Sequence, residues 1–257
     1  MCTLSFLPTR SGYVLAMNRD EQRSRALALP PTHGESGGIP TLCPSEPGGG
    51  TWIGVNARGL SVALLNWYEK PQTTLSNPVS RGTIVPHLLA AENVEGADAR
   101  LEALALGRIR PFRAVMVDPE ACATVEIRWD GAEVGSEKCA WERRHWFSSG
   151  CDEPGANRIR GSVCAAADWS GSNGAEEQLL RRLHAGHDPE RGAFSICMHR
   201  PDARTVSYTE VRVSGEAGEV DYRPGPPCEE APLVTQRLER WRVGDKIVRK
   251  FGRQRVV

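Results

Sequence analysis

The sequence lacks an excess of charge of either sign, a long apolar segment and a paired-cysteine motif, and each absence excludes a class of protein. The 257 residues carry 32 basic and 32 acidic side chains, so no overall field attracts nucleic acid. No run of about 18 apolar residues occurs, so a membrane-spanning helix is not expected. The first residues do not combine a basic region with an apolar one, so no secretory signal is expected either.

The 8 cysteines are scattered, and no two of them form a CxxC pair. This spacing argues against a zinc cluster and against a disulfide scaffold. In the reducing cytoplasm, where we expect the protein to be located, they would be free thiols. A chain of this length buries a large core without disulfides or metals, and we interpret residues 1–257 as one domain.

One cysteine stands directly behind the initiator methionine. Removal of Met1, which a residue as small as Cys2 normally permits, would leave a cysteine with a free α-amino group. This amine has a pKa of roughly 8 in unstructured peptides, so it can take the thiol proton near neutral pH. Cys2 would then supply both nucleophile and base, as in enzymes with an N-terminal threonine.

A β-hairpin is predicted to bring four polar residues beside Cys2. The turn lies at residues 8–12, and the second strand leads into Asn18, Arg19, Asp20 and Glu21. A guanidinium close to sulfur favours thiolate, and a carboxylate can orient the ammonium group. Because neighbours in a strand point to opposite faces, we expect the strand to break here and present Arg19 and Asp20 together. The alternatives are that Asn18 and Asp20, or Arg19 and Glu21, face the sulfur.

These residues carry a resemblance to a known family. The N-terminal Met-Cys-Thr-Leu, the Asn-Arg-Asp-Glu tetrapeptide and the segment Gly-Gly-Thr-Trp-Ile-Gly at residues 49–54 resemble the NRDE family, also called the transport and Golgi organisation protein 2 family. The resemblance is strongest over the first third of the chain and is recognisable again at residues 205–209. It implies an α+β fold, the four-layer αββα sandwich of the N-terminal-nucleophile (Ntn) hydrolases.

The same family is similar to choloylglycine hydrolase and penicillin V acylase, which cleave amide bonds with an N-terminal cysteine. The resemblance therefore implies an amidohydrolase acting on a small acylated substrate, with Cys2 as nucleophile and Arg19 and Asp20 beside it. The alternative is a non-catalytic protein that binds heme, a lipid or acyl-CoA in the same cleft, because both lipid metabolism and heme trafficking are proposed for the family. No cofactor, metal or nucleic-acid partner is expected.

An asparagine at the end of a predicted hairpin, residues 51–66, is a candidate for the oxyanion hole. Asn66 stands in a Leu-Asn context similar to that of the acylases, whose asparagine has this role. A neutral amide donor about 3 Å from the developing charge would stabilise it. Asn66 could equally cap a turn. Four further residues are candidates for contact with the substrate: Asn18, Trp52, Arg81 and Asn157.

Asn157 and the pair Cys197 and His199 allow competing interpretations. The acylases use a second asparagine, but Asn157 matches no motif and also suits a helix start. Cys197 and His199 share one face of a strand predicted at residues 194–199 and could ligate zinc, iron or heme. The sequence offers no evident third ligand, so an ordinary polar strand face is expected and no metal site is assigned.

The remaining segments are predicted from periodicity and turn residues. Residues 22–50 are rich in Pro, Gly and Ser and are predicted to be a loop-rich connector, either a rim over the site or a surface excursion. Residues 224–257 are predicted to be a C-terminal extension whose basic residues pack on the sandwich rather than bind lipid or RNA. Helices are expected at residues 83–92, 97–106, 157–167 and 176–185, and further strands at 114–117, 123–127, 141–147 and 205–213.

Overall fold

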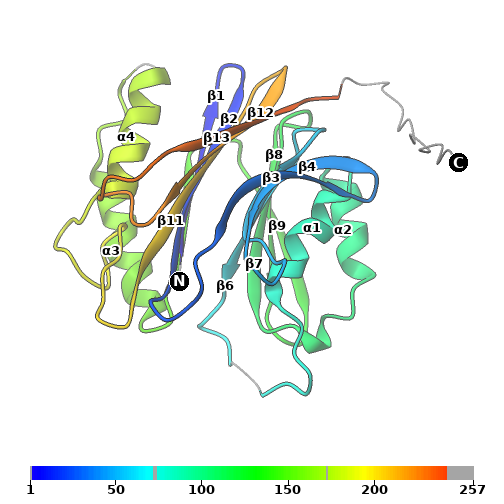
Figure 1. Cartoon of the computed structure of the whole chain (residues 1–257), viewed down its shortest axis with the longest axis horizontal. Helices are drawn as coiled ribbons and strands as arrows, with labels where there is room; N and C mark the ends of the chain where they lie inside the picture. Colours follow the sequence, from blue (N-terminus) through cyan, green and yellow to red (C-terminus); the bar gives the residue numbers. More distant parts are fainter. Residues whose placement is uncertain (1, 72–73, 172, 242–257) are drawn as a thin grey trace, which may run out of the picture.

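Two antiparallel β-sheets form the centre of the computed structural model, which describes residues 2–71, 74–171 and 173–241 (Figure 1). Within these residues the first sheet has six strands, in the spatial order β10 (Arg144–Ser148), β1 (Cys2–Thr9), β2 (Gly12–Gln22), β11 (Ala203–Val213), β12 (Ala217–Pro224) and β13 (Val234–Glu239). The second has seven, in the order β3 (Leu29–Ser36), β4 (Ile39–Ser45), β5 (Ile53–Asn56), β6 (Ser61–Asn66), β7 (Phe112–Asp118), β8 (Ala123–Trp129) and β9 (Val134–Cys139).

Helices cover the outer face of each sheet, which gives the αββα arrangement predicted from the sequence (Figure 1). The second sheet is covered by α1 (Ile84–Leu89) and α2 (Val94–Glu102), with short 3-10 turns at Arg81–Thr83 and Leu106–Arg108. The first is covered by α3 (Glu153–Ala166) and α4 (Asn173–Ala185). None of the helices in the described residues is long and apolar enough to cross a membrane.

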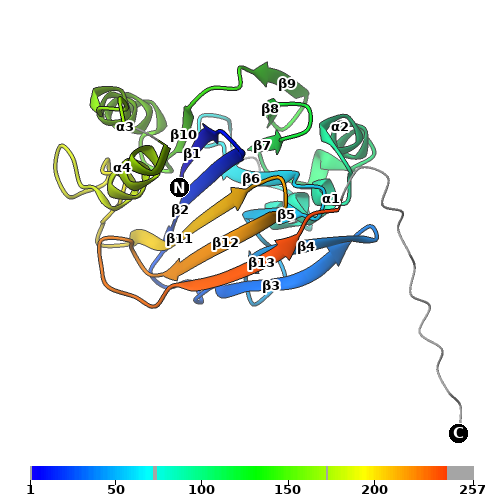
Figure 2. The ribbon, with the colours of Figure 1, turned by 90° about the horizontal axis from the view of Figure 1, so that it is seen from above.

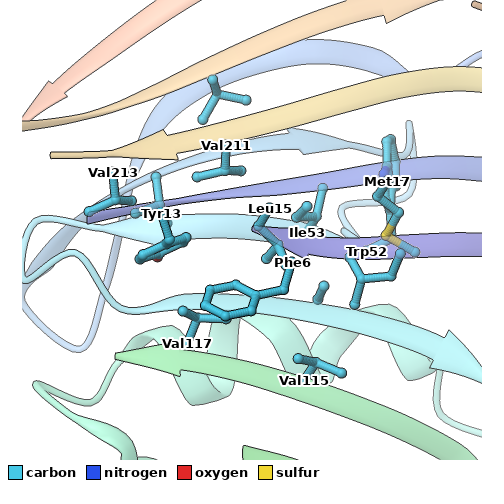
Figure 3. Packing of buried hydrophobic residues seen from close by; sticks show 14 of the residues in the cluster. Phe6, Tyr13, Leu15, Met17, Trp52, Ile53, Val115, Val117, Val211 and Val213 are labelled. Atoms are coloured by element: carbon cyan, nitrogen blue, oxygen red, sulfur yellow. The ribbon is translucent and has the colours of Figure 1, made fainter. Parts of the chain in front are cut away.

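Alternating apolar residues hold the two sheets together (Figure 3). In β1, Leu4 and Phe6 belong to the cluster between the sheets, whereas Thr3 and Ser5 bond to the helical layer on the opposite face. Burial of a side chain such as Phe6 contributes about 1.5–3 kcal/mol. Because β1 lies inside its sheet, between β10 and β2, its first residue Cys2 is fixed on both sides.

The hairpin predicted at residues 51–66 is confirmed as β5 and β6, and it places Asn66 at the end of β6. The prediction of a loop-rich connector at residues 22–50 is wrong, since this segment contains β3 and β4. Strand β3 is a largely exposed edge strand, and its register with β4 shifts where Pro30 and Pro31 stand. An edge strand tolerates proline because its outer side needs no N–H donor. The proline-rich composition was therefore typical of a loop although the segment forms a strand.

Two further segments differ from the sequence prediction. Residues 194–199 do not form a strand and make only an isolated bridge between His199 and Arg204. Helix α3 begins at Glu153, where the Asp152 carboxylate accepts the Gly155 N–H at 2.9 Å, so Asn157 lies inside the helix and does not start it.

The C-terminal extension predicted at residues 224–257 contributes β13 to the first sheet, where it lies beside β3 of the other sheet (Figure 2). This edge strand covers residues 234–239, and residues 242–257, which hold most of the basic side chains, lie outside the described residues.

A buried histidine makes the fold sensitive to acid. Nε2 of His184 lies 2.9 Å from Oγ of Ser5, and its Nδ1 lies 3.0 Å from Oδ1 of Asn18. Burial lowers the pKa of His184 to about 3. In the unfolded chain this histidine takes up a proton near pH 6.5, whereas in the folded chain it stays neutral. The free energy of unfolding should therefore fall as the pH is lowered from 7 to 5, by up to about 1.4 kcal/mol per pH unit.

Urea denaturation at pH 7 and pH 5 checks this expectation. The His184→Gln variant should show a weaker dependence on pH than the wild type. His33→Gln, which changes an exposed histidine of β3, should keep the wild-type dependence. An equal dependence in all three proteins would contradict the assignment to His184.

Candidate active site

Cys2 lies at the wall of a cavity of about 360 Å³ formed at one end of the sandwich. It is paired with Arg19 of β2 and with Ser148 of β10, and only 7% of its surface is exposed. The opposite wall comes from β6 and from the 3-10 turn that precedes α1, through Asn66 and Arg81. The cavity therefore joins the first residue of one sheet to the end of a strand in the other.

The surroundings of the Cys2 sulfur act on its protonation in both directions. Burial raises the pKa of the thiol, and the Asp20 carboxylate adds to this rise. The Asp20 backbone N–H and the Arg19 guanidinium favour the thiolate. Since burial is the largest effect, the thiol needs a base to become a nucleophile.

Arg19 is held on the cavity side of β2. Its Nη2 lies 2.5 Å from Oε1 of Glu46 and 3.5 Å from Oε2 of Glu21, and its guanidinium stacks over the Trp52 ring at 4.5 Å. The expected break at the tetrapeptide is wrong, because β2 continues to Gln22. Arg19 and Glu21 share the cavity face, which was one of the two alternatives.

Asp20 also lines the cavity, but its carboxylate points toward the helical layer behind Cys2. Its fully buried carboxylate accepts the Thr205 hydroxyl at 2.7 Å and lies 3.4 Å from Nη2 of Arg160, a fully buried residue of α3. Nη1 of Arg160 donates to Oγ1 of Thr3 at 2.9 Å and to the Cys2 carbonyl at 3.4 Å. Arg19 and Asp20 thus both lie near Cys2, with side chains on opposite faces of one strand.

The irregularity in this part of the sheet lies in the strand beside β2. Opposite Asp20 and Arg19, the register of β11 shifts between Thr205 and Ser207. The bulge predicted for the tetrapeptide therefore occurs in the partner strand and not in β2.

Three other sequence candidates also line the cavity. Nδ2 of Asn66 donates to the Tyr68 hydroxyl at 2.8 Å, which uses one of the two N–H bonds of the amide. Nε1 of Trp52 is buried without a hydrogen-bond partner in the described part of the chain. Nη1 of Arg81 donates to the Pro111 carbonyl at 3.1 Å, and burial lowers the pKa of its guanidinium.

The other two candidates do not reach the cavity. Asn18 is fully buried against α4, where Nδ2 donates to the carbonyls of His184 and Ile196, so it holds the helix on the sheet. Asn157 lies in α3 and is not among the residues that line the cavity. The prediction that Asn18 and Asn157 contact the substrate is therefore wrong.

Sequence reasoning missed Glu46 and Arg160. Glu46 precedes the tight turn that closes through Gly49, in the segment predicted to be either a rim over the site or a surface excursion, and no single residue of it was a candidate. Arg160 had a usable signal, because it shares the buried face of α3 with Ala156 and Cys164 at helical spacing. An arginine on such a face needs a buried carboxylate, and Asp20 supplies it.

Replacing Arg19 with alanine is expected to slow alkylation of Cys2 about tenfold near neutral pH, equivalent to roughly 1.4 kcal/mol of lost thiolate stabilisation. Loss of the guanidinium also removes one of the two arginine partners of Glu46 and of Glu21, which leaves only Arg25 to balance these two cavity-lining carboxylates. The rate of iodoacetamide labelling at Cys2, followed by peptide mapping, measures the effect. Arg10→Ala, at the far turn of the same hairpin, is the matched control, and equal rates in the two variants would refute the role of Arg19.

The sandwich, with Cys2 opening β1 at the cavity, has a fold like that of the Ntn hydrolases. The chain belongs to the Transport and Golgi organisation 2 family, whose family model matches residues 1–154. A comparison with curated proteins finds no match.

Solved structures share the fold at low sequence identity. Penicillin V acylase from Agrobacterium tumefaciens matches with a TM-score of 0.55 and 11% identity, over 91% of this chain and 85% of that chain. A mutant conjugated bile acid hydrolase from Clostridium perfringens matches with a TM-score of 0.52 and 11% identity, over 92% of both chains. A variant of the same hydrolase gives 0.52 and 12%, over 91% of this chain and 92% of that chain.

Proposed function

We propose that the protein is an N-terminal-cysteine amidohydrolase acting on a small acylated substrate that carries an anionic group. The observation that supports this most is the position of Cys2, with its sulfur at the cavity wall between Arg19 and the Asp20 N–H. Met1 lies outside the described residues, and its removal is part of the proposal.

In the proposed reaction the α-amine of Cys2 takes the thiol proton, and the sulfur attacks the substrate carbonyl. The N–H of Asn66 not used by Tyr68 stabilises the negative oxygen of the tetrahedral intermediate. The ammonium group then protonates the leaving amine, which leaves an acyl thioester on Cys2. Water, activated by the same α-amine, releases the acid and restores the thiol.

The charges of the cavity favour an anionic substrate. Arg19 and Arg25 are paired with Glu46 and Glu21. Arg81 and Arg110 also line the cavity, and neither has a carboxylate partner among the residues that the structure describes. Two guanidinium groups without counterions would bind a carboxylate or phosphate of the substrate, and the unpartnered Nε1 of Trp52 offers a further donor.

Intact-mass analysis tests the proposal. The purified protein should lack Met1, and incubation with a panel of N-acyl amino acids should add one acyl mass, mapped to Cys2. The corresponding N-acyl amides without a carboxylate should react more slowly, and Arg81→Ala should remove this preference. Full retention of Met1 in a folded preparation would refute the mechanism. Reversible binding of heme or a lipid without any adduct would favour the carrier alternative.

A further inference from the structure

A second group of reactive side chains lies outside the Cys2 cavity. His187 follows α4, Cys197 and His199 precede β11, and Cys228 lies between β12 and β13. One ligand atom from each of the four lies within 4.8 Å of those from the other three. None of the four lines the Cys2 cavity.

The distances within this cluster fit a tetrahedral metal site. Nε2 of His199 lies 3.4 Å from the sulfur of Cys228 and 3.6 Å from that of Cys197. Zinc bonds of about 2.3 Å to sulfur and about 2.0–2.1 Å to nitrogen place tetrahedral N and S ligands about 3.5 Å apart. Two of the ligand pairs thus stand at the separation that a zinc ion would impose, and all four ligand atoms lie within 4.8 Å of one another.

Cys228 is exposed, but two other members of the cluster are shielded from solvent, which supports the same interpretation. The Cys197 side chain is fully buried. Nε2 of His187 is shielded from solvent and has no hydrogen-bond partner among the described residues. A buried imidazole nitrogen without a partner costs free energy that a bound ligand would recover. All eight cysteines are described and none forms a disulfide, so Cys197 and Cys228 are available as thiols.

We propose that His187, Cys197, His199 and Cys228 bind one zinc ion. Four protein ligands leave no open coordination position, so the site is structural and not catalytic. Binding releases one proton from each of the two thiols, because thiolate is the ligand form. This proposal does not depend on the amidohydrolase proposal.

Zinc at this position would join two connections that no strand pairing joins among the described residues. The ligands span residues 187–228, so the ion would fix the segment between α4 and β11 to the loop between β12 and β13. The neighbouring Met198 N–H donates to Oγ1 of Thr205 at 2.9 Å, and the same hydroxyl donates to Asp20. The zinc site would therefore brace the residue that supports Cys2 from behind.

One contact must change when the metal binds. Nη2 of the exposed Arg191 lies 3.2 Å from Nδ1 of His199. Coordination through Nε2 leaves the proton on Nδ1, and two donors then face each other. Arg191 must turn to solvent in the loaded protein, so Arg191→Ala should bind the metal more tightly than the wild type.

Cobalt binding tests the site directly. The full chain, treated with chelator and reductant, should bind one equivalent of Co²⁺ with the strong visible bands of tetrahedral cobalt and a thiolate-to-cobalt charge-transfer band. Zinc should displace the cobalt and raise the melting temperature. Cys228→Ser should lose the charge-transfer intensity in part and bind cobalt at least about tenfold more weakly.

The matched control is Cys122→Ser, since Cys122 is an exposed cysteine outside the cluster, and its cobalt spectrum should equal that of the wild type. Wild-type protein that is reduced, folded and without tetrahedral cobalt bands would overturn the proposal. So would an unchanged spectrum in Cys228→Ser. A disulfide between Cys197 and Cys228 whose reduction yields no metal binding would overturn it as well.

Discussion

Replacing Cys2 with alanine is expected to lower the turnover of an N-acyl substrate by about 10⁴-fold or more. Loss of the attacking atom removes covalent catalysis altogether, and removal of a nucleophile in hydrolases costs this much or more. Cys2→Ala keeps an N-terminal amine and a small side chain at the start of β1, so the fold should be retained. Steady-state rates with the best substrate of the N-acyl panel measure the effect.

The control for this experiment is Cys151→Ala, which removes an exposed cysteine that does not line the cavity. Its rate should stay within about twofold of the wild type. Substantial turnover by Cys2→Ala would show that hydrolysis does not pass through a thioester.

Replacing Arg160 with methionine is expected to lower the free energy of unfolding by about 3–5 kcal/mol, the cost of removing one partner from a buried ion pair. Both side chains of the pair with Asp20 are fully buried, and Arg160 also donates to β1. Without the guanidinium, the Asp20 carboxylate stays buried with the Thr205 hydroxyl as a neutral partner.

Urea denaturation compares Arg160→Met with Arg158→Met, which changes an exposed arginine two residues earlier in α3. The Arg158 variant should lose less than about 0.5 kcal/mol. Adding Asp20→Asn to Arg160→Met should recover part of the loss, because it removes the buried charge that has lost its arginine partner. Equal stability of the two arginine variants would contradict the proposed role of Arg160.

The predictable parts of this molecule are those whose information is local. The hairpins around Cys2 and Asn66 were predicted because apolar alternation and glycine turns lie within a few residues of each other. Strand β3 was missed because an exposed edge strand has no apolar face, and its two prolines are typical of a loop.

The His/Cys cluster and the Cys2 cavity could be predicted only in part, because both are formed by residues far apart in the sequence. Cys197 and His199 are visible as a pair in the sequence, but their two partners are separated from them by up to about thirty residues and by two strands. The faces of β2 on which the Arg19 and Asp20 side chains lie depend on whether this strand continues past the tetrapeptide. That is decided by its pairing with β11, more than 180 residues further along the chain.

The position of Cys2 between β10 and β2 has a practical consequence for producing the protein. Any residue left in front of Cys2 would be joined to its α-nitrogen by a peptide bond. The free amine that the proposed reaction requires at the cavity wall would then be absent. An amino-terminal affinity tag would therefore give a folded protein that is inactive in every assay of the proposed hydrolysis. A preparation with a carboxyl-terminal tag, or with a tag that a protease removes to expose Cys2 itself, is the appropriate reagent for screening.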